Sequence, residues 1–287
     1  MTNLSASELI LNPDGSVYHL HLVPQEVAPI VIFVGDPERV DKVSKYFDRV
    51  ELKHHHREFV CHTGFIGHTR LSVISTGIGT DNIDIVMNEL DALVNIDFET
   101  RTPKDTHTAL SIIRLGTSGS LQKHIEVNSF LISEYAVGLD GLLNFYDYKS
   151  DESLLETIKT EVNKLWDISH FYTSERSLQL NDEGDFIKGI TLTCPGFYAP
   201  QNRSLRIESK LNPMFDALRA IKWNNLYLTN MEMETAGIYG MATMLGHKAI
   251  SVNAILANRA THKFSSNPEK TVENMIEKVL EIITISK

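Results

Sequence analysis

Arginine side chains stand beside glycine turns at two places in the first half of the chain. In "VGDPERV", Asp36 can cap a helix that begins at Pro37, which puts Arg39 in the first helical turn. In "IIRLGTSGS", Arg114 interrupts an apolar run, and a glycine turn with the hydroxyl of Thr117 follows it. Guanidinium groups and free backbone N–H groups at a helix start both bind anions, phosphate in particular. These residues therefore predict a phosphate pocket.

Each motif also has a purely structural interpretation. Arg39 would be a surface arginine on a well-capped helix, and Arg114 would form an internal salt bridge to an aspartate or glutamate. A further glycine turn, "STGIGTDN" (75–82), resembles a dinucleotide loop but lacks the third glycine and the later acidic residue of that motif. Three strand ends share this glycine-turn design, which favours a phosphate pocket at the carboxyl edge of a sheet.

A second cluster of donors lies in "TCPGFYAPQNRSLR" (193–206). Its polar members follow the aromatic pair Phe197 and Tyr198, and they are Gln201, Asn202, Arg203 and Arg206. Such a segment is either a solvated loop or a pocket wall that recognises a flat, polar, electron-rich group.

The histidine run in "KHHHREF" (53–59) invites a metal interpretation. Side chains alternate between the two faces of a strand, so only His54 and His56 could chelate one ion together. No cysteine or carboxylate stands at ligand spacing, and we expect no metal site here. Arg57 is the more useful cation of this segment, although an exposed arginine is common.

Composition narrows the class of protein. A formal net charge of −10 over 287 residues argues against nucleic-acid binding, which depends on dispersed positive charge. The only cysteines, Cys61 and Cys194, form no CxxC pair, which is typical of a reducing compartment. The start of the sequence does not resemble a signal peptide, and no apolar run has membrane-spanning length. We expect a cytoplasmic protein that binds neither nucleic acid nor membrane.

Hydrophobic periodicity predicts alternating strands and helices. Strands are expected at 30–35, 70–76, 109–119, 129–139, 189–194 and 248–258, and helices at 36–47, 82–93, 152–167, 231–246 and 268–284. This alternation predicts an α/β fold with a central, mostly parallel (mixed) β-sheet flanked by helices. Residues 1–287 would form a single domain, and the polar stretch 95–108 would be an exposed insertion loop.

Taken in order, "GDPERV", "HREF", "STGIG", "IRLGTSG" and "NMEMETAG" resemble motifs of the nucleoside phosphorylases of the phosphorylase-I type. The resemblance extends from residue 17 to residue 259. It implies a phosphate site made by Gly35, Arg39, Arg114 and Thr117. It also implies that Arg57 comes from a neighbouring subunit, as does His19, which would reach the ribose 5′-hydroxyl. Met233 would lie against the sugar, and Glu234 would bind its hydroxyls.

The implied reaction is phosphorolysis, in which phosphate attacks the anomeric carbon through a transition state with oxocarbenium character. It needs no protein nucleophile and no organic cofactor, but it needs groups that position phosphate and ribose and stabilise the departing base. Glu232 and Glu234 are two residues apart, about 200° around a helix, so we do not expect them to share one ligand. The alternative is that this acidic pair only complements a helix start.

The base site separates purine from pyrimidine substrates. Purine-cleaving members of the family carry an aspartate after the last core strand, where this sequence has Asn258 and Arg259. The segment "FYAPQNR" instead resembles the uracil-recognition segment of uridine-cleaving members. The resemblance implies that Phe197 packs on the base, Gln201 and Arg203 bond its polar edge, and Arg259 supports the O4 side directly or through water. Together with Arg114 and Glu234, Gln201 and Arg203 make up the expected catalytic set.

The expected substrates are therefore uridine and phosphate, and the products are uracil and ribose 1-phosphate. Sites completed by a neighbour imply a homo-oligomer, at least a dimer, and bacterial members are typically hexamers. Ser118 replaces a threonine common in the pyrimidine enzymes. Glu58 and Ile78 match a monovalent-cation site at a dimer interface, but Asn82 replaces its serine, so cation binding stays open. A purine phosphorylase, a nucleosidase that uses water, or a noncatalytic nucleoside-binding module are the alternatives.

Overall fold

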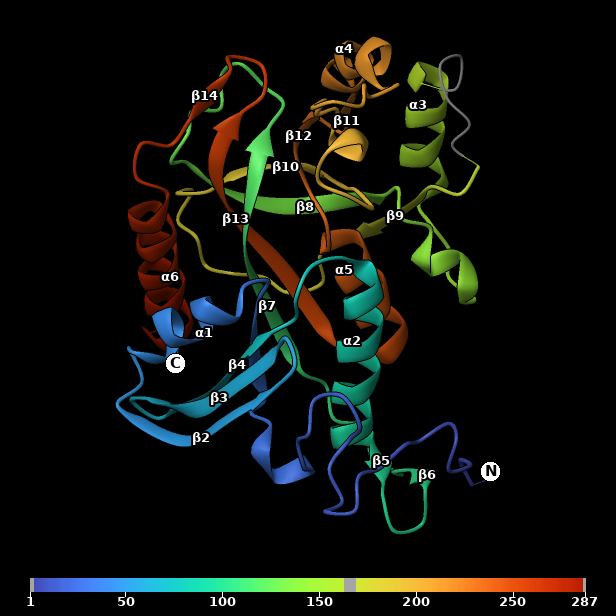
Figure 1. Cartoon of the computed structure of the whole chain (residues 1–287), viewed down its shortest axis with the longest axis vertical. Helices are drawn as coiled ribbons and strands as arrows, with labels where there is room; N and C mark the ends of the chain where they lie inside the picture. The colour runs from blue at the N-terminus through green and yellow to red at the C-terminus, as the bar shows by residue number, and fades with distance from the viewer. Residues whose placement is uncertain (1–2, 163–168, 286–287) are drawn as a thin grey trace.

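The computed structural model describes residues 3–162 and 169–285, and a mixed β-sheet forms its centre (Figure 1). The strands of this sheet are β1 Ile30–Val34, β2 Arg49–His56, β3 Phe59–Ile66, β4 Thr69–Ser75, β7 Ser111–Ser120, β8 Phe130–Gly138, β9 Tyr172–Glu175, β10 Ile187–Thr193, β11 Lys222–Trp223, β12 Leu226–Glu232, β13 Lys248–Asn258 and β14 Lys263–Phe264. The helices are α1 Pro37–Ser44, α2 Thr80–Asn95, α3 Glu152–Val162, α4 Asn212–Ala220, α5 Thr235–Leu245 and α6 Pro268–Ile285, with short 3₁₀ turns η1 Pro24–Glu26, η2 Leu142–Phe145 and η3 Ala199–Gln201.

The strand order is β11-β12-β10-β8-β13-β7-β1-β4-β3-β2, with β14 paired to β13 and β9 paired to β8. Strands β4, β1, β7 and β13 pair in parallel, as do β8, β10 and β12. Antiparallel pairing joins β13 to β8 and forms the β2-β3-β4 meander. The α/β class and the mixed central sheet are confirmed, although antiparallel pairs are more numerous than the expectation of a mostly parallel sheet implied.

Alternating residues of β1 fill two different cores. Val31 and Phe33 pack with α2 and α5 on one face of the sheet, while Ile32 and Val34 pack with α1 and α6 on the other. All four side chains are fully buried, as expected for a central parallel strand covered on both faces. The phosphate-binding candidates at the end of β1 are therefore carried by one of the most completely packed strands of the fold.

A third core lies under α3 and α4, at the side of the sheet formed by β10 and β12. Leu154 and Ile158 of α3 meet Phe215 and Leu218 of α4 above these strands. This core supports the chain between β10 and α4, which contains the aromatic and polar segment noted in the sequence. None of the helices in the described ranges combines the length and apolar character needed to cross a bilayer.

The expected strands and helices are confirmed in place, with one error of type. Residues 231–246 do not form one helix, because β12 extends to Glu232 and α5 begins only at Thr235. Hydrophobic periodicity does not distinguish a buried strand end from a buried helix start in so short an apolar run. The helix expected at 152–167 is observed as α3 up to Val162, and 163–168 lie outside the described residues.

The polar stretch 95–108 carries a small two-stranded hairpin, β5 Ile96–Asp97 with β6 Thr102–Pro103. Arg101, at the turn of this hairpin, donates to the carbonyls of Leu4 and Ser5, each at 2.8 Å, and also to that of Leu9. Residues 103–109 are exposed. The hairpin thus fastens the N-terminal segment to the end of α2.

Replacing a buried leucine of α2 tests the layer that packs on β1. Leu90→Ala removes a fully buried side chain, and we expect it to lower the free energy of unfolding by about 2–5 kcal/mol, because a cavity remains. Leu205→Ala makes the same chemical change at a side chain that is 78% exposed and should change stability by less than about 0.5 kcal/mol. Urea denaturation measures both, and equal effects would contradict the assignment of this core.

Candidate active site

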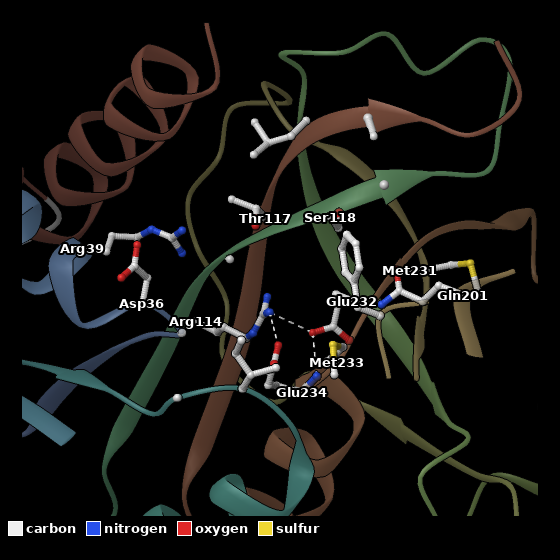
Figure 2. Close-up of a pocket in the computed structure, with 18 of the residues that line it drawn as sticks. Asp36, Arg39, Arg114, Thr117, Ser118, Gln201, Met231, Glu232, Met233 and Glu234 are labelled. Carbon is white, nitrogen blue, oxygen red and sulfur yellow. Dashed lines mark hydrogen bonds and ion pairs between the residues drawn. The ribbon is translucent and has the colours of Figure 1, made fainter. Parts of the chain in front are cut away.

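A cavity of about 820 Å³ opens at the carboxyl ends of β1 and β7, where the β12–α5 turn also meets the sheet (Figure 2). Strand ends, glycine turns and the 197–203 loop line it. The residues predicted from the sequence that reach this cavity are Gly35, Arg39, Arg114, Thr117, Phe197, Gln201, Arg203, Met233 and Glu234. Segments separated by up to two hundred residues in the chain therefore share one cavity, as parallel strand ends predict.

Arg39 lies at the end of the cavity beside α1, where the sequence predicts an anion. Asp36 accepts a hydrogen bond from the N–H of Glu38 at 3.0 Å and so caps α1, as the sequence predicted. The Arg39 side chain returns towards the cavity, where Nη1 donates to the carbonyl of Leu115 at 3.3 Å. Burial lowers the pKa of Arg39. Within the described residues no carboxylate forms an ion pair with Arg39, and its one side-chain hydrogen bond leaves its other N–H groups available at the cavity wall.

Arg114 is paired inside the protein, as its structural interpretation anticipated. Its Nη2 lies 3.0 Å from Glu232 Oε2 and 2.5 Å from Glu234 Oε2, and its Nη1 donates to Asn253 Oδ1 at 2.9 Å. Burial by itself lowers the pKa of Arg114, but the two carboxylates raise it above its ordinary value. Arg114 also lines the cavity, so it can form the salt bridge and still be within reach of an anion bound there.

The expectation that Glu232 and Glu234 lie about 200° apart on a helix is wrong. It assumed a helix, whereas residues 232–234 form the turn between β12 and α5, so that both carboxylates reach Arg114 (Figure 2). Glu232 also accepts from the N–H groups of Glu234 and Thr235, at 3.0 and 2.9 Å, which satisfies donors at the start of α5. Glu234 accepts from the N–H of Gly79 at 2.9 Å. Both acids are therefore fixed in position.

The opposite end of the cavity is built from the 197–203 loop. Arg203 donates through Nη1 to Gln201 Oε1 at 2.6 Å and to the carbonyl of Phe197 at 2.8 Å, and its guanidinium stacks 3.8 Å from the Phe197 ring centre. Gln201 is only 3% exposed. Its Oε1 accepts from Arg203, so its side-chain NH₂ group is the part that can donate to a ligand. Burial, and then the charge of Arg259, lower the pKa of Arg203 to about 10, so it is charged at neutral pH.

Arg259 does not line the cavity. Its guanidinium donates to the backbone carbonyls of Gln201 and Asn202, at 2.9 and 3.0 Å. Asn202 has a left-handed backbone with φ of 54°, and Arg259 helps to hold the chain there. The geometry therefore gives Arg259 a supporting contact with the 197–203 loop, and its expected role at the O4 side of the base, directly or through water, stays a prediction.

His19 and Arg57 also lie outside the residues that line the cavity. His19 Nδ1 lies 2.6 Å from Glu89 Oε1, and the backbone N–H of His19 donates to the same carboxylate at 2.9 Å. Arg57 is exposed at the turn between β2 and β3, 5.8 Å from the ring centre of Tyr18. The resemblance assigned both residues to the site of a neighbouring subunit, and that assignment stays a prediction.

The histidine run places His54 and His56 on one face of β2, where both rings stack on His21 with centres 5.9 and 3.7 Å apart. Stacked imidazoles direct their ring faces, not their nitrogen lone pairs, at one another, which does not favour chelation. A separate group of residues, Asp91, His107 and His247, brings possible ligand atoms within 4.8 Å of one another.

This second cluster is a poor metal site for a chemical reason. The N–H of Leu110 donates to Nδ1 of His247 at 3.1 Å. In a neutral imidazole whose Nδ1 accepts, Nε2 carries the proton and has no lone pair for a metal. The nitrogen of His247 that faces Asp91 at 3.4 Å is therefore a donor.

Fourteen further residues line the cavity that the sequence did not assign to the phosphate, ribose or base site. They are Asp36, Pro37, Glu58, Gly77, Ile78, Asn82, Gly116, Ser118, Gly119, Met231, Glu232, Leu256, Ala257 and Phe264. Glu58, Ile78 and Asn82, the residues compared above with a monovalent-cation site, all line this cavity, and the side chains of Glu58 and Asn82 lie beside Gly77. Cation binding stays an open question. Phe264 belongs to the two-residue strand β14 and is 67% exposed, and so short a strand gives no periodic signal in the sequence.

Comparisons with known proteins agree with this arrangement. Residues 29–285 match the family model described as the phosphorylase superfamily. A uridine phosphorylase of Thermococcus kodakarensis is 30% identical over 278 residues, which cover 94% of this chain and 87% of that protein. A uridine phosphorylase of Haemophilus influenzae is 27% identical over 93% of this chain and 95% of its own. A solved Trypanosoma brucei nucleoside phosphorylase, described as showing uridine phosphorylase activity, superposes with a TM-score of 0.86 at 28% identity, over 97% of this chain and 100% of that chain.

Inorganic phosphate is the probe for the anion-binding end of the cavity. Arg39→Ala removes the guanidinium with unused donors, and we expect phosphate affinity to fall roughly 10- to 100-fold, the usual loss for a charged hydrogen bond. Isothermal titration calorimetry with phosphate measures the change, and the melting temperature checks folding. Arg219→Ala is a matched control, because Arg219 pairs with Asp216 away from the cavity and should leave phosphate binding unchanged. Unchanged affinity in Arg39→Ala would remove Arg39 from the anion site.

Proposed function

Because the chain belongs to the phosphorylase superfamily, we propose that it catalyses the reversible phosphorolysis of uridine to uracil and ribose 1-phosphate. The observation that carries this proposal is that one cavity holds an arginine-rich end at Arg39 and Arg114 and an amide-and-arginine end at Gln201 and Arg203. The first suits phosphate, and the second suits the polar edge of a pyrimidine. The uridine phosphorylases among the relatives support the same assignment.

Phosphate would act as the nucleophile, and the protein would position it. Arg39 and Thr117 line the anion end, and Arg114 lies between that end and the carboxylate of Glu234, which would hold the ribose. Binding both reactants in one cavity turns a bimolecular attack on the anomeric carbon into a step within one complex. The retained arginines favour phosphate over water as the attacking group.

Glu234 would bind the ribose hydroxyls, with Met233 against the sugar. Its carboxylate is already oriented by the N–H of Gly79 and by Arg114, so little reorganisation is needed when the ribose arrives. A fixed carboxylate close to the ribose also stabilises the positive charge that develops on the sugar in an oxocarbenium-like transition state. This combination assigns Glu234 both a binding and an electrostatic role.

At the base end, donors would stabilise the negative charge of the departing uracil. Gln201 and Arg203 provide amide and guanidinium N–H groups, and Phe197 provides an apolar surface for the ring. Asn258 stands where purine-cleaving members carry an acid, and its amide donates to the carbonyls of Gln122 and Ile125 at 2.9 and 2.7 Å. The Asn258 amide is therefore used in structural hydrogen bonds and cannot protonate N7 of a purine. This favours a pyrimidine substrate.

The proposal includes a cytoplasmic homo-oligomer that needs no organic cofactor. Both cysteines are unpaired and buried, in keeping with a reducing compartment.

The oligomer is inferred from two side chains. His19 and Arg57 could bind a nucleoside and phosphate, yet neither lines the cavity of its own chain. A second copy that brings these residues to the cavity would complete the site, so the assembly is at least a dimer.

Phosphate dependence separates the proposed reaction from its alternatives. We expect uracil release from uridine to require inorganic phosphate and to yield ribose 1-phosphate, because the arginines hold phosphate as the attacking group. Chromatography of a nucleoside panel, with and without phosphate, measures this. Equal release without phosphate would identify a nucleosidase, cleavage of inosine in preference to uridine would identify a purine enzyme, and binding without cleavage would identify a noncatalytic module.

Arg203→Ala tests the base-recognition loop. We expect kcat/KM for uridine to fall roughly 10- to 1000-fold, because a donor to the departing base is lost and Gln201 loses its partner. Arg206→Ala is the matched control, since Arg206 is exposed on the same loop and does not line the cavity. Its kcat/KM should remain within about twofold of the parent. Similar losses in both variants would show that the loop, and not Arg203 itself, is responsible.

A further inference from the structure

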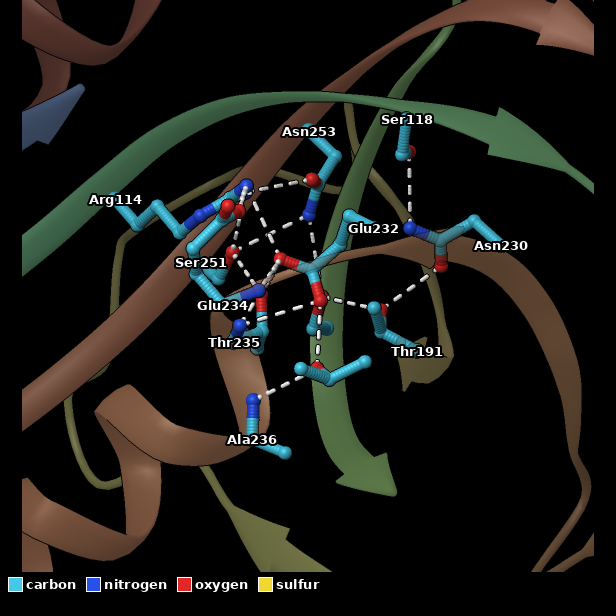
Figure 3. A network of polar contacts seen from close by, with 12 residues as sticks. Arg114, Ser118, Thr191, Asn230, Glu232, Glu234, Thr235, Ala236, Ser251 and Asn253 are labelled. Atoms are coloured by element: carbon cyan, nitrogen blue, oxygen red, sulfur yellow. Dashed lines mark hydrogen bonds and ion pairs between the residues drawn. The ribbon is translucent and has the colours of Figure 1, made fainter. Parts of the chain in front are cut away.

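A chain of buried hydrogen bonds leaves Arg114 and returns to the same cavity at Ser118 (Figure 3). Its direction is fixed at the first link, because a guanidinium can donate but cannot accept. Arg114 Nη1 donates to Asn253 Oδ1 at 2.9 Å, so the amide nitrogen of Asn253 points the other way and donates to Ser133 Oγ at 3.3 Å. Asn253 and Ser133 are fully buried, and solvent does not compete for these bonds.

The remaining links preserve that direction. Ser133 Oγ lies 2.5 Å from Thr191 Oγ1, and the Thr191 hydroxyl donates to Asn230 Oδ1 at 2.8 Å. Asn230 then donates through Nδ2 to Ser118 Oγ at 2.9 Å. Thr191 and Asn230 are also fully buried, so the orientation of the Asn230 amide follows from its neighbours.

This arrangement determines what the Ser118 hydroxyl can do. Its oxygen accepts from Asn230, so its proton is available for donation. Among the described residues, no hydrogen bond takes that proton, and Ser118 lines the cavity while being only 9% exposed. In the view of Figure 2, Thr117 lies on the Arg39 side of Ser118 and Gln201 lies on the other side. The free proton is therefore available to a ligand in the cavity, at a position between Thr117 and Gln201.

We propose that Ser118 is a catalytic hydrogen-bond donor to a carbonyl oxygen of the pyrimidine, and that Asn230 is the positioning residue that fixes its direction. This inference rests on the proposed function. Chains of hydrogen bonds that run one way polarise one another, and here the first donor is a cation. As the glycosidic bond breaks, negative charge grows on the base carbonyl, and a donor already aimed at it stabilises the transition state more than the ground state.

Ser118→Ala removes the donor. We expect the single-turnover rate of uridine cleavage with phosphate to fall roughly 10- to 100-fold, at or below the loss typical of an oxyanion-hole donor. With 5-fluorouridine the loss should be smaller, because fluorine makes the departing base more acidic and less dependent on a donor. Ser44→Ala is the matched control: Ser44 is a buried hydroxyl bonded to His62 at 2.7 Å, outside the cavity, and both rates should be unchanged.

Asn230→Asp tests the direction of the bond with almost no change of shape. The carboxylate oxygen that replaces Nδ2 can only accept, so it would capture the Ser118 proton and remove it from the cavity. We expect a loss similar to that of Ser118→Ala, and the double variant should be no slower than either single variant. Thr191→Val removes one of the two threonine hydroxyls that can donate to Asn230 Oδ1, and it should give a smaller loss in the same direction. This variant replaces Asn230→Asp if the buried acid prevents folding.

The outcomes are separable. If the parent protein cleaves uridine but Ser118→Ala has an unchanged rate, or loses equally with uridine and 5-fluorouridine, the role of Ser118 is overturned and the proposed function stands. Additive losses in the Ser118→Ala/Asn230→Asp variant would overturn the role of Asn230. A parent protein that does not cleave uridine would overturn the proposed function and this inference together.

Discussion

The pairing of Arg114 with Glu232 and Glu234 is the interaction on which the site depends. A charge inside a protein is costly unless it is paired and hydrogen-bonded, and all three side chains are less than a tenth exposed. Arg114 comes from β7, and the two acids come from the turn between β12 and α5. The ion pair therefore fixes the distance between the phosphate end of the cavity and the carboxylate that would hold the ribose.

The backbone around Arg114 is shaped to admit its side chain. The guanidinium folds back over the strand, and a methyl group on Gly116 would lie 1.8 Å from Nη1. The glycine in "RLGTSG" is thus needed for the approach of the arginine two residues earlier. Asn253, which accepts from Arg114, lies on β13, and β13 pairs in parallel with β7 so that Asn253 stands opposite Gly116 and Ser251 stands opposite Arg114. Gly116, Arg114 and Asn253 come together only because β7 and β13 pair in this register.

Much of the fold could be predicted because hydrophobic periodicity and turn residues are local signals. The buried run at 30–35 and the capped helix after it are examples, with Asp36 capping α1 as expected. The β12–α5 boundary was missed because "MEMET" is equally compatible with a strand end and a helix start, and only pairing with β10 extends β12 to Glu232. The same error of secondary structure produced the wrong expectation that Glu232 and Glu234 point apart.

The sequence by itself determined which functional side chains are present and that several of them stand at the ends of strands. Arg39 and Arg114 were identified because three strand ends share glycine turns with nearby donors, and Gln201 and Arg203 were identified by the resemblance to a uracil-recognition segment. Tertiary structure alone decided which donors remain free, because that depends on contacts across the sheet. Arg114 is occupied by two acids, Arg259 by two carbonyls, and Arg39 faces the cavity. The direction of the Ser118 hydroxyl likewise follows from partners on four other strands, whose hydrogen bonds no local pattern encodes.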